Sequence, residues 1–287
     1  MTTFLVTGVG GPAGRSLAAL LMERKLNVIG TDMQPLAGTG FPFFQVPPAN
    51  SPDLFRTIRE IAAREHVDWV IPTVSEELPV FAAGWKGLDG CPVLISSAQA
   101  VGIANDKYLT ARCLSGAGVS VPRFALPADM HSPDEVAARL GWPCISKPRV
   151  GRGGREVALR TEKDWPLIAT LGDRYILQEF AAGSDYAPNV YAGKDRGTIV
   201  IVLEKTELKE GIVGNAKQVR RVEAADVADL AAAAARTVGL SGPLDIDIRR
   251  RRDGTPVVLE INARFGANIR HAPEVLDAAL RMNLAVS

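Results

Sequence analysis

Residues 257–264 read VVLEINAR, and this short stretch says most about how the chain folds and what it binds. An apolar run that ends in Glu260, Asn262 and Arg264 is typical of a β-strand, in which every second side chain lies on the same face. A carboxylate and a carboxamide oxygen on one face are hard ligands suited to Mg²⁺. The guanidinium of Arg264 is suited to phosphate oxygens. The alternative is a strand whose polar face only meets solvent, and the stretch alone leaves it open.

The bulk composition is that of a globular protein with two domains, or with one domain and a lid. The chain has 287 residues, of which 47% are hydrophobic and 23% charged, with a net charge of +1. Near-neutral charge gives no reason to expect nucleic acid or a membrane surface as partner. Three cysteines and three histidines without motif spacing indicate reduced thiols and argue against zinc. We find no signal-peptide pattern and no apolar run of membrane-spanning length, so we expect a cytoplasmic protein.

The N-terminal hundred residues alternate between strand and helix patterns. The expected strands are Thr3–Thr7, Asn27–Thr31, Asp68–Pro72 and Val93–Ser96, and the expected helices are Ala13–Glu23 and Pro52–His66. Ser51 is the expected N-cap of the second helix. This alternation predicts an open α/β domain with a parallel sheet over residues 1–100.

The remaining chain predicts a helical region over residues 97–121 and then a strand-rich part. The expected strands are Pro143–Lys147, Tyr175–Phe180, Thr198–Glu204, Leu244–Ile248 and Pro256–Ile261, with a helix at Ala224–Val238. The arginine run 249–252 before Asp253-Gly254 is typical of a hairpin turn. We interpret it as a solvated turn, with contact to an anionic substrate or partner as the less favoured alternative.

The turn after the first strand contains Gly8, Gly11 and Gly14, and Asp32 closes the second strand. Such a turn offers helix amides to an anion, and the acid stands where a dinucleotide-binding fold holds the ribose. A short-chain dehydrogenase would also need a Tyr-x-x-x-Lys pair, and none of the four tyrosines has a lysine at that spacing. The turn therefore either binds a ligand or permits close packing of helix against strand.

Three further groups of residues suit a nucleotide. Residues 145–155 read ISKPRVGRGGR, in which Lys147 precedes a glycine loop able to wrap phosphates, although a basic surface hairpin is the alternative. Residues 178–185 read QEFAAGSD, where Gln178 and the backbone suit adenine and Asp185 suits ribose, unless this is an ordinary strand end. Asp247 is expected to lie opposite Glu260 and Asn262 on antiparallel strands, where they would share one or two Mg²⁺ ions.

Taken in order, these motifs resemble the ATP-grasp enzymes, in particular the carboxylate–amine ligase branch that is similar to the carbamoyl-phosphate synthase large subunit. The segments that carry the resemblance are VTG with Gly11, DWVIPT and EEL within residues 68–78, NDK at 105–107, SKP at 146–148, QEF at 178–180 and EINAR at 260–264. The resemblance implies an α/β fold, α+β in its ATP-grasp part. An open parallel-sheet pre-ATP-grasp domain (1–100) would precede a two-lobed ATP-grasp fold with a small lobe, or lid (101–180), and a C-terminal lobe with the Mg²⁺ site (181–287).

The resemblance also implies a role for individual residues. The ATP phosphates would be held by Lys107, Lys147 and the loop glycines Gly151, Gly153 and Gly154. The adenine-reading hinge would be Gln178, Glu179, Phe180 and Ala181, with Asp185 in the place of an acidic ribose ligand that is usually Glu. The Mg²⁺ ligands would be Asp247, Glu260 and Asn262. The catalytic cations would be Arg264 and Lys147, with Lys205 as a basic substrate contact.

The implied reaction is ATP-dependent formation of an amide or peptide bond from a small carboxylate and an amine, through an acyl phosphate. The alternatives are an NAD(P)-dependent short-chain-type reductase and a non-catalytic ATP-binding partner subunit. A homodimer is common among such relatives.

The chain departs from the family pattern after the metal strand. It has Phe265-Gly266-Ala267-Asn268 where many relatives have Gly-Gly, and it reaches Ser287 sooner than most relatives end. We therefore expect an acceptor site that a partner subunit completes or that is open to a large acceptor. Arg270 and His271 lie at that edge, where an ordinary surface role is favoured.

Overall fold

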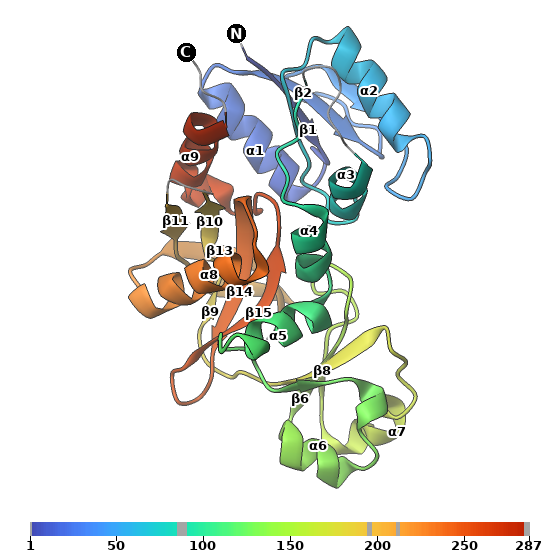
Figure 1. Ribbon diagram of the computed structural model, residues 1–287, viewed down its shortest axis with the longest axis vertical. Coiled ribbons are helices and arrows are strands. Elements are labelled where there is room, and N and C mark those ends of the chain that lie inside the picture. Colours follow the sequence, from blue (N-terminus) through green and yellow to red (C-terminus); the bar gives the residue numbers. More distant parts are fainter. Residues whose placement is uncertain (1, 85–90, 194–196, 211–212, 284–287) are drawn as a thin grey trace.

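The computed structural model describes residues 2–84, 91–193, 197–210 and 213–283, in which three β-sheets follow one another along an elongated molecule (Figure 1). The N-terminal parallel sheet lies at one end of the long axis and a small antiparallel sheet at the other. The largest sheet lies between them.

The N-terminal sheet has four parallel strands in the order β3-β2-β1-β4. The strands are β1 (Thr3–Thr7), β2 (Asn27–Asp32), β3 (Phe43–Gln45) and β4 (Trp69–Ile71), and the helices are α1 (Pro12–Glu23), α2 (Leu54–Arg64) and α3 (Leu78–Gly84). Parallel neighbours need crossover connections, which α1 and α2 supply. The predicted open parallel sheet is thus confirmed, and β3 is a strand that the sequence did not indicate.

Two local predictions in this part were wrong. The second helix begins at Leu54 with Asp53 as N-cap, because the Ser51 hydroxyl accepts a hydrogen bond from Asp53 N (3.2 Å) in a turn before the helix. The expected strand Val93–Ser96 forms only a single parallel bridge, between Val93 and Val70. Its neighbour β4 is three residues long and so offers little edge for pairing.

Two helices, α4 (Ala98–Asn105) and α5 (Lys107–Gly116), lead to the small antiparallel sheet, whose order is β5-β8-β6-β7. Its strands are β5 (Phe124–Ala125), β6 (Cys144–Pro148), β7 (Ala158–Arg160) and β8 (Tyr175–Glu179), and its helices are α6 (Pro133–Arg139), α7 (Trp165–Ile168), η1 (Pro127–Asp129) and η2 (Glu162–Asp164). Both α6 and α7 lie on one face and bury Val136, Ile168 and Leu177 in a small core.

The central sheet has seven strands, with β15 paired to β14 beside the path β11-β10-β14-β9-β12-β13. Its strands are β9 (Asp185–Tyr186), β10 (Asn189–Ala192), β11 (Thr198–Ile201), β12 (Leu203–Glu210), β13 (Val213–Arg221), β14 (Gly242–Arg250) and β15 (Pro256–Asn262). Helix α8 (Ala225–Val238) packs Ala231 and Val238 into the same core as Ile246 and Ile261 of the sheet. One face of β14 and β15 is therefore apolar, and the other is left for polar side chains.

The arginine run at the β14–β15 hairpin is not the solvated turn that the sequence predicts. Arg249 lies 5.2 Å over the Phe180 ring, and Arg250 donates to both oxygens of Asp226 at 2.6 and 2.9 Å. Arg251 pairs with Glu179 at 3.3 Å, and Arg252 is exposed. The first three arginines pack against neighbouring strands and helices because the hairpin folds back onto them.

The last helices close a core that the first strands begin. The chain after β15 forms η3 (Ile269–His271) and α9 (Pro273–Asn283). Phe265 and, on α9, Val275 pack in one cluster with Phe4 of β1 and Leu17 of α1. Figure 1 shows α9 beside α1, near both ends of the drawn chain. The division into units at residues 100 and 180 stays a prediction, and Ser287 lies outside the described residues.

Gly14 allows α1 to pack directly on the turn after β1, which favours the packing interpretation at this position. A Cβ there would lie 2.4 Å from the carbonyl oxygen of Gly8 and 2.9 Å from that of Thr7. Backbone atoms cannot move aside cheaply. We expect Gly14→Ala to lower the free energy of unfolding by about 2–3 kcal/mol in urea denaturation.

The matched control is Gly102→Ala in α4, where a Cβ would meet nothing within 4 Å. Because Ala favours helix over Gly by about 1 kcal/mol, this variant should be slightly more stable than the wild type. Equal stability of the Gly14 and Gly102 variants would contradict the packing role.

Candidate functional site

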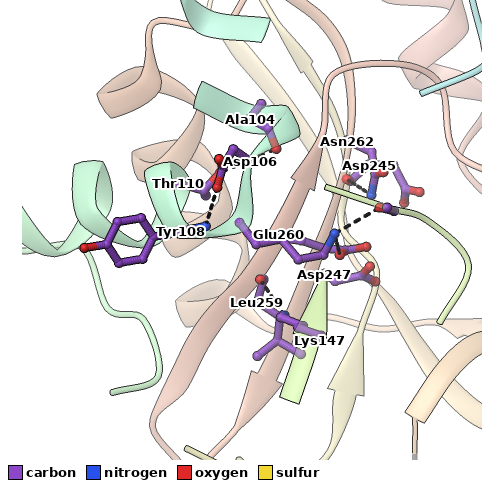
Figure 2. A network of polar contacts seen from close by, with 12 residues as sticks. Ala104, Asp106, Tyr108, Thr110, Lys147, Asp245, Asp247, Leu259, Glu260 and Asn262 are labelled. Carbon is purple, nitrogen blue, oxygen red and sulfur yellow. Dashed lines mark hydrogen bonds and ion pairs between the residues drawn. The ribbon is translucent and has the colours of Figure 1, made fainter. Parts of the chain in front are cut away.

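The polar face of β14 and β15 is set by their antiparallel register. Asp247 lies opposite Glu260, as the sequence predicts, whereas Asn262 lies opposite Asp245 and not Asp247. The register shifts after Asp247, so that Ile248 pairs with Val258 and Leu259 is the extra residue of a β-bulge. The bulge keeps Val258 in the core and still presents Glu260 on the polar face. Figure 2 shows Asp245, Asp247, Glu260 and Asn262 side by side on these strands.

Three buried lysines from three different elements converge on this face. Lys107 Nζ lies 3.0 Å from Glu260 Oε2 and also donates to the carbonyl oxygen of Gly151 at 3.0 Å. Lys147, on β6, donates to the carbonyl oxygen of Leu259 at 3.2 Å. Lys205, on β12, lies 2.6 Å from Asp247 Oδ1 and 3.2 Å from Asp185 Oδ1. The structure thus brings together lysines that are up to 98 residues apart in the sequence.

The carboxylates and lysines shift one another's ionisation. Burial raises the pKa of Asp247, with Lys205 acting in the opposite sense, so its carboxyl group holds a proton more readily than usual. Burial opposes the shift at Glu260, but Lys107 and Lys147 lower the pKa of that carboxyl below its usual range. Burial also lowers the pKa of Lys147, to about 8. A cation bound at Asp247 would therefore be favourable, because this carboxylate lies beside that of Glu260.

Lys107 is positioned by the residue that caps its helix. The Asp106 carboxylate accepts hydrogen bonds from the amides of Tyr108 and Leu109 at the start of α5. The same carboxylate accepts from Arg149, which follows β6, at 2.6 Å. One aspartate therefore fixes the first turn of α5 and joins it to the small sheet.

A cavity lies beside this polar face, between the small and central sheets. Its lining residues are Ile145, Lys147, Gly153, Gly154, Val157, Gln178, Glu179, Phe180, Ala181, Asp185, Lys205, Asp247, Arg249, Leu259 and Glu260. One of its buried polar atoms, Gln178 Nε2, has no hydrogen bond to any described residue, whereas Asp185 Oδ1 is in the ion pair with Lys205. Buried polar groups are normally satisfied, so the Gln178 amide indicates a polar ligand.

Some predicted residues lie outside that cavity. Lys107, Gly151 and Asn262 line a smaller cavity on the other side of Glu260, together with Ser75 and Asn105. Glu260 contacts both cavities, which makes it the boundary between them.

Arg264 is held by a residue that sequence reasoning missed. Its Nη1 donates to Asp245 Oδ2 at 2.8 Å and to the carbonyl oxygen of Phe265 at 3.0 Å. A Cβ at Gly266 would lie 2.6 Å from the Asp245 carboxyl carbon, so glycine is needed there. The alternation Asp245-Ile246-Asp247 was a visible signal that both carboxylates share a face.

The donor set on this face fits Mg²⁺ better than a transition metal. Within the described ranges no group of three or more His, Cys, Asp or Glu side chains has the arrangement of a metal site. Asp247, Glu260 and Asn262 instead offer two carboxylates and one carboxamide, and Mg²⁺ typically takes one or two carboxylates and completes its shell with phosphate oxygens and water.

A second polar cluster lies at the carboxyl edge of the parallel sheet. The Thr7 hydroxyl donates to Glu77 Oε2 at 2.5 Å and accepts from Thr73 N at 3.1 Å. Asp32 accepts from Gly10 N and from Gln34 N, both at 2.9 Å. Arg152, in the glycine loop of the small sheet, reaches this edge and pairs with Glu76 at 2.6 Å. The glycine loop thus contacts both the lysine cluster and the N-terminal sheet.

Comparison with known protein families gives a match for the middle of the chain. A family model described as an ATP-grasp domain matches residues 104–268. This range contains the predicted phosphate, adenine and metal residues and Arg264. No helix among the described residues is long and apolar enough to span a membrane.

Relatives of known function match parts of the chain. The carbamoyl phosphate synthase large chain of Rubrobacter xylanophilus is 30% identical over 102 residues, which are 36% of this chain and 10% of that protein. The D-alanine–D-alanine ligase of Neisseria gonorrhoeae is 26% identical over 191 residues, 62% of this chain and 63% of that protein. The chain thus covers less than two thirds of the length of either relative.

Solved structures share the fold over almost the whole chain. The L-amino acid ligase from Bacillus licheniformis superposes with a TM-score of 0.69 at 17% identity, over 96% of this chain and 70% of that one. The N5-carboxyaminoimidazole ribonucleotide synthetase from Thermotoga maritima gives 0.71 at 18% identity, over 99% and 76%. At such identities the likeness concerns the fold alone.

The buried Glu77 carboxyl predicts a pH-dependent stability. Burial raises its pKa from 4.5 to about 7, with the Thr7 hydrogen bond opposing the shift. Below pH 4.5 the carboxyl is protonated in both the folded and the unfolded protein, so its burial does not lower the free energy of unfolding. As the pH rises above 4.5 and through 7, the unfolded protein ionises more readily than the folded one, and the wild type loses stability. We expect Glu77→Gln to gain roughly 3 kcal/mol relative to the wild type between pH 4 and pH 8 in urea denaturation.

Glu76→Gln is the control, because the Glu76 side chain is 49% exposed and pairs with Arg152 at the surface. It should follow the wild type within about 1 kcal/mol at both pH values. Parallel pH profiles for the wild type and Glu77→Gln would contradict the buried titration.

Proposed function

The chain belongs to the ATP-grasp domain family, and on this premise we propose that it is an ATP- and Mg²⁺-dependent ligase that joins a carboxylate to an amine. The observation that carries the proposal is the convergence of Lys107, Lys147 and Lys205 on Asp247 and Glu260, beside a cavity where the buried Gln178 amide nitrogen has no partner. The products would be an amide, ADP and phosphate.

ATP would occupy the cavity between the small and central sheets. The adenine ring would lie near Gln178, Phe180 and Leu259, where the unpartnered Gln178 amide supports a hydrogen bond to the base. Asp185, which lines the same cavity, would accept from a ribose hydroxyl. The phosphates would point toward the lysine cluster, with Gly153 and Gly154 closing over them.

The lysines and the carboxylates have separate tasks in this scheme. Asp247, Glu260 and Asn262 would hold Mg²⁺, which neutralises the phosphate oxygens when bound. Lys205 now pairs with Asp247 and Asp185, and its ammonium would turn to a phosphate oxygen once the metal neutralises these carboxylates. The buried ammonium groups act in a water-poor site, where preorganised charge contributes most to rate.

The reaction would take place in two displacements. A carboxylate oxygen of the first substrate bonds to the γ-phosphorus while the bond to the β,γ-bridging oxygen breaks, which gives an acyl phosphate and ADP. The amine nitrogen then bonds to the acyl carbon, loses a proton and expels phosphate. Positioning and charge neutralisation are sufficient for the phosphoryl step, so no protein nucleophile is required.

The smaller cavity on the far side of Glu260 is the proposed place for the acceptor. It is lined by Ser75, Asn105 and Lys107 and adjoins the N-terminal sheet. Arg264, oriented by Asp245, would stabilise the negative charge of the acyl phosphate. The ligase names of the D-alanine–D-alanine and L-amino acid relatives support amino acids as the first substrates to test.

The alternative of an NAD(P)-dependent reductase has less support. Both oxygens of Asp32 accept hydrogen bonds from the backbone amides of Gly10 and Gln34, which gives this acid a structural role in the turn. A non-catalytic ATP-binding subunit would have little need for the buried Arg264–Asp245 pair beside the metal residues.

Calorimetry with MgATP and, separately, with NADPH tests the assignment on the wild type and on Glu260→Gln. We expect Mg²⁺-dependent ATP binding that weakens at least about tenfold in the variant, because one metal ligand and the Lys107 partner lose their charge. Release of ADP and phosphate is then measured with a panel of amino acids. Binding of NADPH without ATP would overturn the family-based activity, and ATP binding without turnover for any pair would favour the non-catalytic subunit.

Asp245→Asn separates catalysis from nucleotide binding. If Asp245 orients Arg264, the variant should lose about 10- to 100-fold in kcat for ADP release while its Kd for ADP stays within about threefold. The control is Asp277→Asn, which removes a partner of Arg24 away from the cavity and should leave both constants unchanged. A parallel loss of nucleotide affinity in Asp245→Asn would contradict a positioning role.

A further inference from the structure

A third cavity, unused by the proposed reaction, lies between the small sheet and the tip of the β14–β15 hairpin. Its volume is about 290 Å³, and it is lined by Arg123, Leu140, Gly141, Trp142, Pro143, Glu179, Phe180, Arg251, Arg252 and Asp253. This volume suits a small organic molecule. Glu179 and Phe180 also line the nucleotide cavity, so these two residues form the wall between the two spaces.

Positive side chains outnumber negative ones in the lining of this cavity. Arg123 Nε and Arg251 Nε approach the same oxygen of Glu179, at 3.2 and 3.3 Å. Arg252 makes no ion pair with any residue that the structure describes, and Asp253 is engaged by its own turn, accepting from Thr255 N at 2.9 Å. Two guanidinium groups therefore share the Glu179 carboxylate, and the guanidinium of Arg252 keeps its donors free.

The rest of the lining is largely apolar. It includes Leu140, Trp142, Pro143 and Phe180, and Leu140 is 2% exposed. The indole Nε1 of Trp142 is buried without a hydrogen-bond partner among the described residues. An apolar lining together with free guanidinium donors is suited to a ligand with an apolar body and an anionic end.

We propose that this cavity binds a small organic anion, with its carboxylate or phosphate on Arg252, Arg251 and Arg123 and its apolar body against Trp142 and Phe180. The site is separate from that of the nucleotide phosphates, since the three buried lysines line the other spaces and not this one. It does not depend on the ligase activity. It gives the arginine run a binding role in place of the solvated turn.

Calorimetry with phenyl phosphate and with benzoate, each at constant ionic strength, tests the site on the full chain. These probes share the apolar ring and distinguish phosphate from carboxylate, while benzyl alcohol supplies the ring without charge. We expect at least one anion to bind the wild type, with a Kd at least about tenfold weaker in Arg252→Ala and no detectable binding in Arg252→Glu. Benzyl alcohol should not bind.

Arg220→Ala is the matched control, because the Arg220 side chain is 67% exposed and pairs with Glu204 on the central sheet. It should leave the anion Kd unchanged within about twofold. Absence of binding by both anions would overturn the proposal, and so would equal affinity in the wild type and in both Arg252 variants. In the latter case, loss of binding in Lys147→Met would assign the anion to the nucleotide cavity.

Discussion

Three lysines can be buried in one place because the central sheet supplies each of them with a carboxylate or a carbonyl oxygen, and the candidate site depends on this balance. Lys107 and Lys205 each lie within 3.0 Å of a carboxylate oxygen, and Lys147 donates to the carbonyl oxygen of Leu259. An unpaired buried charge would cost several kcal/mol, so removal of one member affects all the others. The three lysines come from α5, β6 and β12, which means that the helical region, the small sheet and the central sheet must all be correctly placed before the charges can balance.

The balance has a geometric origin in the pairing of β14 with β15. Without the extra residue at Leu259, the alternation along β15 would place either Val258 or Glu260 on the wrong face. The bulge resolves this conflict and also aims the Leu259 carbonyl at Lys147. Core packing by α8 and charge pairing on the polar face therefore depend on the same local irregularity in one strand.

The sequence predicted the parallel sheet, the strand pair β14–β15 of the central sheet and the meeting of Asp247 with Glu260, because these follow from periodicity and from short connections. It did not indicate β9, β10 or β13. Asp245 was missed because its alternation with Asp247 shows only that the two share a face, whereas the bulge that decides which residue each one faces cannot be read from the pattern. The arginine run was misread because local composition cannot reveal that Asp226 and Glu179, distant in the sequence, lie beside the hairpin. The N-cap of the second helix was predicted two residues too early, at Ser51, because N-caps and ST-turns use the same residue types. Secondary structure could largely be predicted from the sequence, whereas ion pairs between residues distant in the sequence could not.

The shared core of β1, α1 and α9 also bears on how the chain acquires its structure during synthesis. Phe4 and Leu17 are buried against Phe265 and Val275, which the ribosome adds more than 240 residues later. The N-terminal sheet therefore leaves an apolar face of α1 and β1 uncovered until nearly all of the described chain has been made. Such a high sequence separation slows folding and prolongs exposure to aggregation. The β1–α1 segment is thus made long before the residues that complete its core.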